Sequence, residues 1–134
     1  MNSPFQLSEA GFIALHPMVI IAQSKYKTNV DKISEFTNTS RHHVAKVLSK
    51  LSKVGFIKSF RGPGGGFYLN RKPSEINLLQ ILETVDGKYE INNYCQFNKR
   101  VCPFDKCIMD GKLTQFKRDF VNYLSEQKLI NYLS

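Results

Sequence analysis

The sequence lacks an apolar run long enough to cross a membrane. Its longest one, residues 12–22, has eleven residues, whereas a membrane-spanning helix needs about 20. Neither a basic leader nor a small-residue cleavage pattern accompanies it, so we expect a cytoplasmic protein. Because the run is apolar almost all round, we expect a first helix over about residues 8–24 that packs on its own domain and on a partner subunit.

The sequence also lacks the usual marks of an enzyme. The glycine-rich stretch of residues 62–66 is not followed by Gly-Lys-Ser/Thr, and no helical pattern begins from it, so the signal for a nucleotide-binding loop is weak. No paired carboxylates and no nucleophile with a suitable base stand out. We therefore expect a protein without catalytic activity.

Acidic residues are scarce in the first half of the chain, although the whole protein has a net charge of +8. Residues 1–73 contain 11 Lys or Arg and 3 Asp or Glu, whereas residues 74–134 contain 8 of each. The entire positive excess thus lies in one half of the chain. Such an uneven distribution favours a nucleic acid partner over a surface that is charged only for solubility.

A basic helix is predicted from Ser40 to Val54. Valine and leucine recur at helical spacing along one side, Ser40 is a suitable N-cap and Gly55 a suitable C-cap. The apolar side is needed for a core, which makes an anionic membrane the weaker alternative partner. The opposite side contains no acid of its own, and we expect it to contact double-stranded DNA. Its candidate residues are Ser40, Arg41, His42, His43, Lys46 and Lys50.

The basic helix has a short predicted helix before it and a predicted hairpin after it. A helix over about residues 30–36 and the turn 37–40 complete a helix-turn-helix motif. Short strands at residues 56–60 and 67–70 flank a Gly/Pro tip, which indicates a wing. The wing residues that we expect at the phosphate backbone or a minor groove are Lys58, Arg61, Gly62 and Gly64.

Two further helices are predicted in the second half of the chain. One begins near Asn77, with Gln80 as its capping-box partner, and ends near Gly87. The other occupies the last twenty or so residues, because apolar residues recur there at intervals of three and four. We expect its apolar stripe to pack on the first helix or on the same helix of a second subunit. The stripe consists of Leu113, Phe116, Phe120 and Leu124.

The three cysteines of the chain lie close together, in a stretch without apolar periodicity. Cys95, Cys102 and Cys107 are spaced Cys-x6-Cys-x4-Cys. In a cytoplasmic protein, such a group more often binds a metal or senses redox state than forms a structural disulfide. Three thiolates and one further ligand can hold an iron–sulfur cluster. A zinc site is an alternative, although structural zinc sites usually contain a Cys-x2-Cys pair. The simplest alternative is that the three thiols bind nothing.

Three features together resemble the Rrf2 family of bacterial transcription regulators. They are residues 51–69 with the wing tip Arg-Gly-x-x-Gly-Gly, residues 76–87, and the cysteine trio. The resemblance covers nearly the whole chain and implies a dimeric regulator whose DNA binding depends on an iron–sulfur cluster beside the subunit interface. Cys102 lies one position later than the middle cysteine of that pattern, so the cluster type, [2Fe–2S] or [4Fe–4S], stays open.

These expectations together define a mainly α-helical protein. It has a winged helix-turn-helix with a small β-hairpin wing, a cysteine-bearing loop and a long C-terminal dimerisation helix. The expected parts are a DNA-binding domain at residues 1–87, the cysteine segment at residues 88–112 and the dimerisation helix at residues 113–134. The alternative function is a cluster-free regulator of the same fold that senses through thiols or through a bound partner or ligand.

The family resemblance offers several positions for the fourth ligand. In one branch a histidine follows the third cysteine by three positions, where this chain has Asp110. In another branch the ligand is an acid of the first helix, where this chain has Phe12, and a further branch uses a histidine one turn later, which is His16. His16 is also the only polar residue of the run 12–22, where an unpaired imidazole would be destabilising. We therefore expect His16 to complete the cluster of the other subunit, with Asp110 as the alternative.

Overall fold

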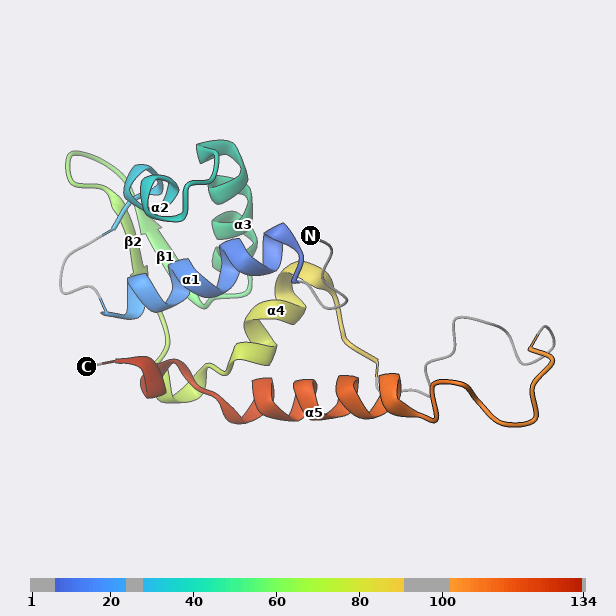
Figure 1. The fold of residues 1–134 in the computed structure, drawn as a ribbon. Helices are drawn as coiled ribbons and strands as arrows, with labels where there is room; N and C mark the ends of the chain where they lie inside the picture. Colours follow the sequence, from blue (N-terminus) through green and yellow to red (C-terminus); the bar gives the residue numbers. More distant parts are fainter. Residues whose placement is uncertain (1–6, 24–27, 91–101, 134) are drawn as a thin grey trace.

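The computed structural model describes residues 7–23, 28–90 and 102–133. Helices α1 to α4 and a β-hairpin form the body of the molecule, and α5 runs along one side of it and extends beyond it (Figure 1). The elements are α1 (Glu9–Gln23), α2 (Val30–Thr37), α3 (Arg41–Lys53), β1 (Ile57–Phe60), β2 (Gly66–Leu69), η1 (Pro73–Glu75), α4 (Leu78–Asp86), α5 (Lys112–Glu126) and η2 (Leu129–Tyr132). A mainly helical protein with one small hairpin is therefore confirmed.

The core lies where α1, α3 and α4 pack against one another. Each of these helices contributes apolar side chains from one face, as the helical spacing predicts. Only one face of α1 is covered within a single chain, and the opposite face leaves Phe12 and His16 exposed. The largest fully buried side chains include Ile13, Met18, Ile33, Leu48, Leu51, Ile57, Ile76, Ile81, Leu82 and Leu129.

The turn between α2 and α3 is fixed by hydrogen bonds at both of its ends. Asn38 adopts the left-handed conformation, with φ of 52°, and ends α2. The Thr39 backbone N–H donates to the Ser34 carbonyl at 3.1 Å, and the Ser34 hydroxyl donates back to the Thr39 carbonyl. Because Ser34 and Thr39 form two hydrogen bonds with each other across the turn, they restrict the orientation of α2 relative to α3.

The wing is anchored to the segment that precedes α2. Strands β1 and β2 are antiparallel, with Ile57 opposite Leu69, and Thr28 forms an additional bridge with Phe67. A side chain at Gly66 would meet the Thr28 carbonyl oxygen, since a Cβ placed there would lie 2.2 Å from it. Glycine is therefore required at Gly66 for this close approach. The predicted hairpin is confirmed, but its bridge to Thr28 was not expected.

The C-terminal region differs from the expected single helix. The predicted capping box of α4 is present, because the Asn77 and Gln80 side chains each accept a hydrogen bond from the other's backbone N–H. Helix α5, however, ends at Glu126, and the chain continues into η2. A bridge between Asn77 and Lys128 joins this C-terminal segment to the start of α4. The prediction of one helix up to the chain end is wrong, because these contacts stabilise a separate 3-10 turn.

The Gly66–Thr28 contact yields a prediction of stability. Gly66→Ala should lower the free energy of unfolding by about 1–3 kcal/mol, the usual cost of overpacking a site that has no spare room. Ser59→Ala is the control, since Ser59 is exposed on the neighbouring strand and should change stability by less than about 0.5 kcal/mol. Urea denaturation measures both variants. Equal stability of the two would show that the wing is not anchored at Thr28.

Candidate DNA-binding surface and cysteine segment

Helix α3 presents its predicted DNA-contacting residues to solvent. Ser40 is its N-cap and accepts a hydrogen bond at 3.2 Å from the backbone N–H of His43. Val44, Leu48 and Leu51 face the core, which turns the basic side outward. Gly55, with φ of 86°, follows the last turn. The exposed candidates on this helix and its cap are Ser40, Arg41, His42, His43, Lys46 and Lys50.

The surface around α3 contains two acids that the linear sequence pattern did not place there. Asp31 of α2 accepts from Arg41, with 2.5 Å between Oδ1 and Nε. Glu9 of α1 contacts His43, with 3.1 Å between Oε1 and Nδ1. Helix α3 itself contains no acid, as expected, but neighbouring helices bring two acids to the surface around it. The acids were missed because they come from other helices.

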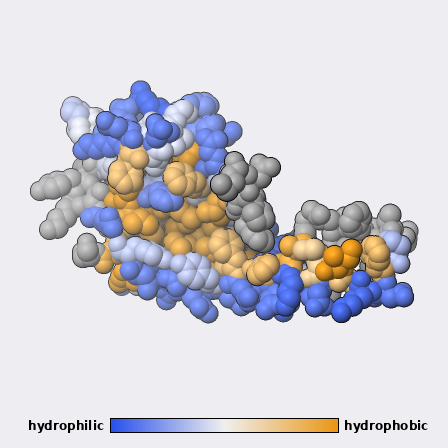
Figure 2. All heavy atoms as spheres, viewed as in Figure 1, coloured by the Kyte–Doolittle hydropathy of each residue, from blue (hydrophilic) through white to orange (hydrophobic). Residues whose placement is uncertain are grey.

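The wing brings its predicted residues to the same side of the molecule as α3. Lys58 and Arg61 are exposed, and Gly62 and Gly64 have positive φ at the tip. In Figure 1, α3 and the tip lie on the side of the body opposite α5. Figure 2 shows hydrophilic residues over that side and hydrophobic residues between the body and α5. The fold thus brings the basic helix and the wing together on one face.

Two residues after the wing bind the end of α3 and were not singled out from the sequence. Arg71 donates to the Val54 carbonyl at 2.9 Å, and its guanidinium lies 5.0 Å from the centre of the Phe56 ring. Asn70 donates to the Gly55 carbonyl at 3.0 Å. Because these contacts join the base of the wing to the end of the basic helix, they fix the two DNA-facing elements relative to each other.

The cysteine segment, residues 88–112, is described at residues 88–90 and from residue 102 onward. Cys102 is half-buried and Cys107 is exposed, while Cys95 lies outside the described residues. The pKa of the Cys107 thiol is lowered because backbone N–H groups of Met109 and the two following residues donate to it. No group of three or more potential metal ligands occurs within residues 7–23, 28–90 and 102–133. Cys107 is therefore an exposed thiol that loses its proton more readily than an ordinary cysteine.

The two candidate fourth ligands occupy different regions. His16 is exposed, its Nδ1 lies 3.0 Å from the Phe12 carbonyl oxygen, and its ring lies 4.2 Å from that of Phe12. The sequence argument from an unpaired buried imidazole is therefore wrong for the single chain. Asp110 is exposed, with φ of 52°. In Figure 1 the part of the chain from 102 to 111 projects beyond the start of α5 and away from α1, so His16 does not meet it within one chain.

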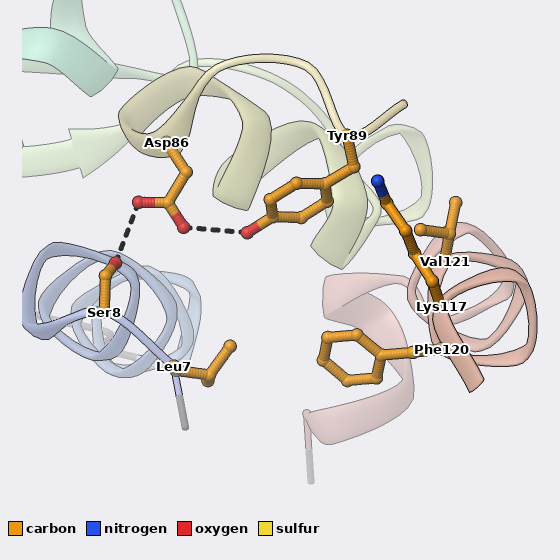
Figure 3. Close-up of a pocket in the computed structure, with 7 residues that line it drawn as sticks. All are labelled: Leu7, Ser8, Asp86, Tyr89, Lys117, Phe120 and Val121. Carbon is orange, nitrogen blue, oxygen red and sulfur yellow. Dashed lines mark hydrogen bonds between the residues drawn. The ribbon is translucent and has the colours of Figure 1, made fainter. Parts of the chain in front are cut away.

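A pocket of about 410 Å³ lies between the start of α1, the end of α4 and α5. Figure 3 shows Asp86 accepting hydrogen bonds from the Ser8 hydroxyl at 2.8 Å and the Tyr89 hydroxyl at 2.7 Å. Burial and the hydrogen bond to Asp86 raise the pKa of Tyr89, so its hydroxyl remains a donor. These bonds attach the start of the cysteine segment to α1. The pocket is lined by Leu7, Ser8, Asp86, Tyr89, Lys117, Phe120 and Val121.

The helix-turn-helix, with its basic second helix and attached hairpin, defines a winged-helix DNA-binding protein. A model of the Rrf2 family, described as an iron-dependent transcriptional regulator, matches residues 7–132. The chain therefore belongs to the Rrf2 family and is a DNA-binding transcriptional regulator. This confirms the family resemblance and the expectation that the protein is not an enzyme. Among the described residues, no helix is long and apolar enough to span a membrane.

Named relatives fall into more than one group of the family. The chain is 28% identical over 131 residues to IscR of Pectobacterium atrosepticum, covering 94% of this chain and 79% of that protein. It is 29% identical over 75 residues to NsrR of Bacillus subtilis, which covers 56% of this chain and about half of that relative, 51%.

Solved structures show the same fold. The structure of CymR, the global cysteine regulator of B. subtilis, has a TM-score of 0.73 and 23% identity, with 93% of each chain covered. T. potens IscR has a TM-score of 0.71 and 21% identity, covering 95% of this chain and 85% of that one.

The DNA-facing surface yields a prediction of affinity. Arg41→Ala and Arg61→Ala should each weaken binding to a duplex selected from a random pool by about 1–3 kcal/mol, the range for one specific base contact. Fluorescence anisotropy at physiological salt measures the change. Lys128→Ala is the control, because it removes one charge from an exposed side chain between α5 and η2. Unchanged affinity in both arginine variants would contradict the assigned surface.

Proposed function

We propose that this regulator binds a palindromic operator as a homodimer and that an iron–sulfur cluster at the cysteine segment controls the binding. The observation that carries the proposal is the position of the cysteines in a regulator of this fold. Cys102 and Cys107 lie just before α5, and the Cys107 thiol has a lowered pKa. Because thiolate is the form that binds metal, this donor set suits a cluster.

Exposed apolar side chains on α5 support the homodimer. Phe116 is 53% exposed, Phe120 45% and Tyr123 51%, although Val121 and Leu124 of the same helix are buried. Such a face is typical of an interface between subunits. A two-fold dimer would place each α3 in a major groove, with half-sites about one helical turn apart, and each wing at a flanking minor groove. Anionic lipid is disfavoured because the basic face belongs to α3, whose apolar side is buried.

In this proposal the ligands are Cys95, Cys102 and Cys107, with His16 of the partner subunit as the fourth and Asp110 as the alternative. When bound, an iron–sulfur cluster supplies a redox-active group whose stability depends on its ligands and solvent exposure. The cysteine segment leads directly into α5, and α5 packs on α4. A movement of this segment is therefore transmitted through α5 to the rest of the subunit. It changes the distance between the α3 helices of the two subunits, while each subunit moves as a rigid body.

A cluster-free regulator that senses through its thiols is the second candidate. Cys107 is exposed and its pKa is lowered, and exposed thiols with a low pKa are the ones that oxidants modify first. The two candidates differ in whether the protein contains iron and sulfide.

The ligand assignment yields a prediction about composition. Protein purified without oxygen should be brown and contain iron and acid-labile sulfide, and Cys95→Ala, Cys102→Ala and Cys107→Ala should each lose both, because three thiolates and one other ligand leave none spare. Asp105→Asn is the control, since Asp105 is an exposed residue between two of the cysteines. A colourless wild-type protein without iron would favour the thiol-based alternative. Full iron and sulfide in one cysteine variant would exclude that residue.

The fourth ligand is tested by a matched pair of variants. His16→Ala should change the visible spectrum and make operator affinity independent of oxidation, while the protein stays folded and dimeric. Asp110→Ala should keep the wild-type spectrum. Absorbance spectroscopy, molar mass by light scattering and operator binding before and after oxidation measure these properties. The opposite result, a normal His16→Ala and an altered Asp110→Ala, would assign the ligand to the cysteine segment and contradict a cluster shared between subunits.

A further inference from the structure

The first turn of α3 has an unusual charge for the start of a helix. Arg41, His42 and His43 occupy it, and it contains no acid. The amino end of a helix has a partial positive charge, so acidic residues are favoured there and cations are disfavoured. A nearby carboxylate offsets this unfavourable charge, and Asp31 contacts the Arg41 guanidinium.

Asp31 is placed by rigid local structure. It lies in the first turn of α2, where Asn29 is the N-cap and accepts a hydrogen bond from the Lys32 N–H at 2.9 Å. The reciprocal bonds between Ser34 and Thr39 set α2 against α3. The contact between Asp31 and Arg41 consequently joins the first turns of two helices whose relative position is already fixed.

The ion pair contributes little to the stability of the fold. The Arg41 and Asp31 side chains are 71% and 65% exposed, and exposed pairs of this kind typically add little to the stability of a protein. An acid beside a DNA-binding surface also repels phosphate and lowers affinity for every duplex. A role in folding or in general affinity thus does not account for its position, whereas a role in orienting Arg41 does.

We infer that Asp31 positions the Arg41 guanidinium for base recognition and so determines operator specificity, an inference that rests on the proposed placement of α3 in the major groove. Asp31 contacts the Arg41 guanidinium at Nε. Guanidinium has five N–H donors in a planar fork, so donors remain on both terminal nitrogens. Two such donors suit the O6 and N7 acceptors of guanine. Holding the side chain in one direction before binding reduces the entropy lost when it meets a base.

Glu35 provides a matched control for Asp31. It lies on the same helix, one turn further on, and is also exposed. Among the described residues, no ion pair of Glu35 occurs. Asp31→Asn and Glu35→Gln therefore each remove one negative charge from the exposed side of α2, and only the first removes a contact with Arg41.

The experiment compares dissociation constants for the selected operator and for an unrelated duplex of equal length. Both charge-removing variants should bind the unrelated duplex more tightly, by similar factors, because each removes one repulsive charge. Asp31→Asn should lower the ratio of operator to unrelated affinity about five- to ten-fold, which lies in the lower part of the range for one base contact. Glu35→Gln should leave this ratio unchanged. In an Arg41→Ala background, Asp31→Asn should have no further effect on the ratio.

The outcomes separate this inference from the proposed function. If Asp31→Asn and Glu35→Gln leave the ratio equally unchanged while Arg41→Ala lowers it, the inference about Asp31 is wrong and the placement of α3 stands. If Arg41→Ala also leaves the ratio unchanged, both are wrong. Thermal unfolding of the four variants checks that each is folded, and a circular dichroism spectrum checks that α2 persists in Asp31→Asn.

Discussion

The packing of α3 against α1 and α4 is the interaction on which the functional surface depends. Val44, Leu48 and Leu51 are fully buried there, and burying side chains of this size stabilises a fold by about 1.5–3 kcal/mol each. Because an α-helix turns 100° per residue, burial of these positions leaves the basic residues of α3 facing solvent. The same contact that stabilises the domain therefore orients the surface that faces DNA.

Local structure could be predicted well from the sequence because its causes are local. The caps at Ser40 and Asn77 are side chains that bond to backbone groups three residues away, and the hairpin follows from a glycine-rich tip between two short strands. The contacts that the sequence did not predict join distant parts of the chain. The bridge from Thr28 to Phe67 and the pairing of Asp31 with Arg41 depend on how elements pack, and no periodicity in the sequence encodes that.

The candidate site also combines features that the sequence predicts and features that depend on how distant elements pack. The basic residues of α3 and the wing could be found from charge and spacing alone, since both belong to single elements. His16 was inferred from an apolar environment that the single chain does not provide, because its side of α1 is exposed. A pattern of residue types along a helix reports which side chains share a face, but it does not report which faces a neighbouring element covers.

The first turn of α1 lies between the two functional regions of the chain. Ser8 donates to Asp86, which also accepts from Tyr89 at the start of the cysteine segment. The next residue, Glu9, contacts His43 on the DNA-facing side of α3. Two adjacent residues, Ser8 and Glu9, therefore connect the start of the cysteine segment with the DNA-facing side of α3.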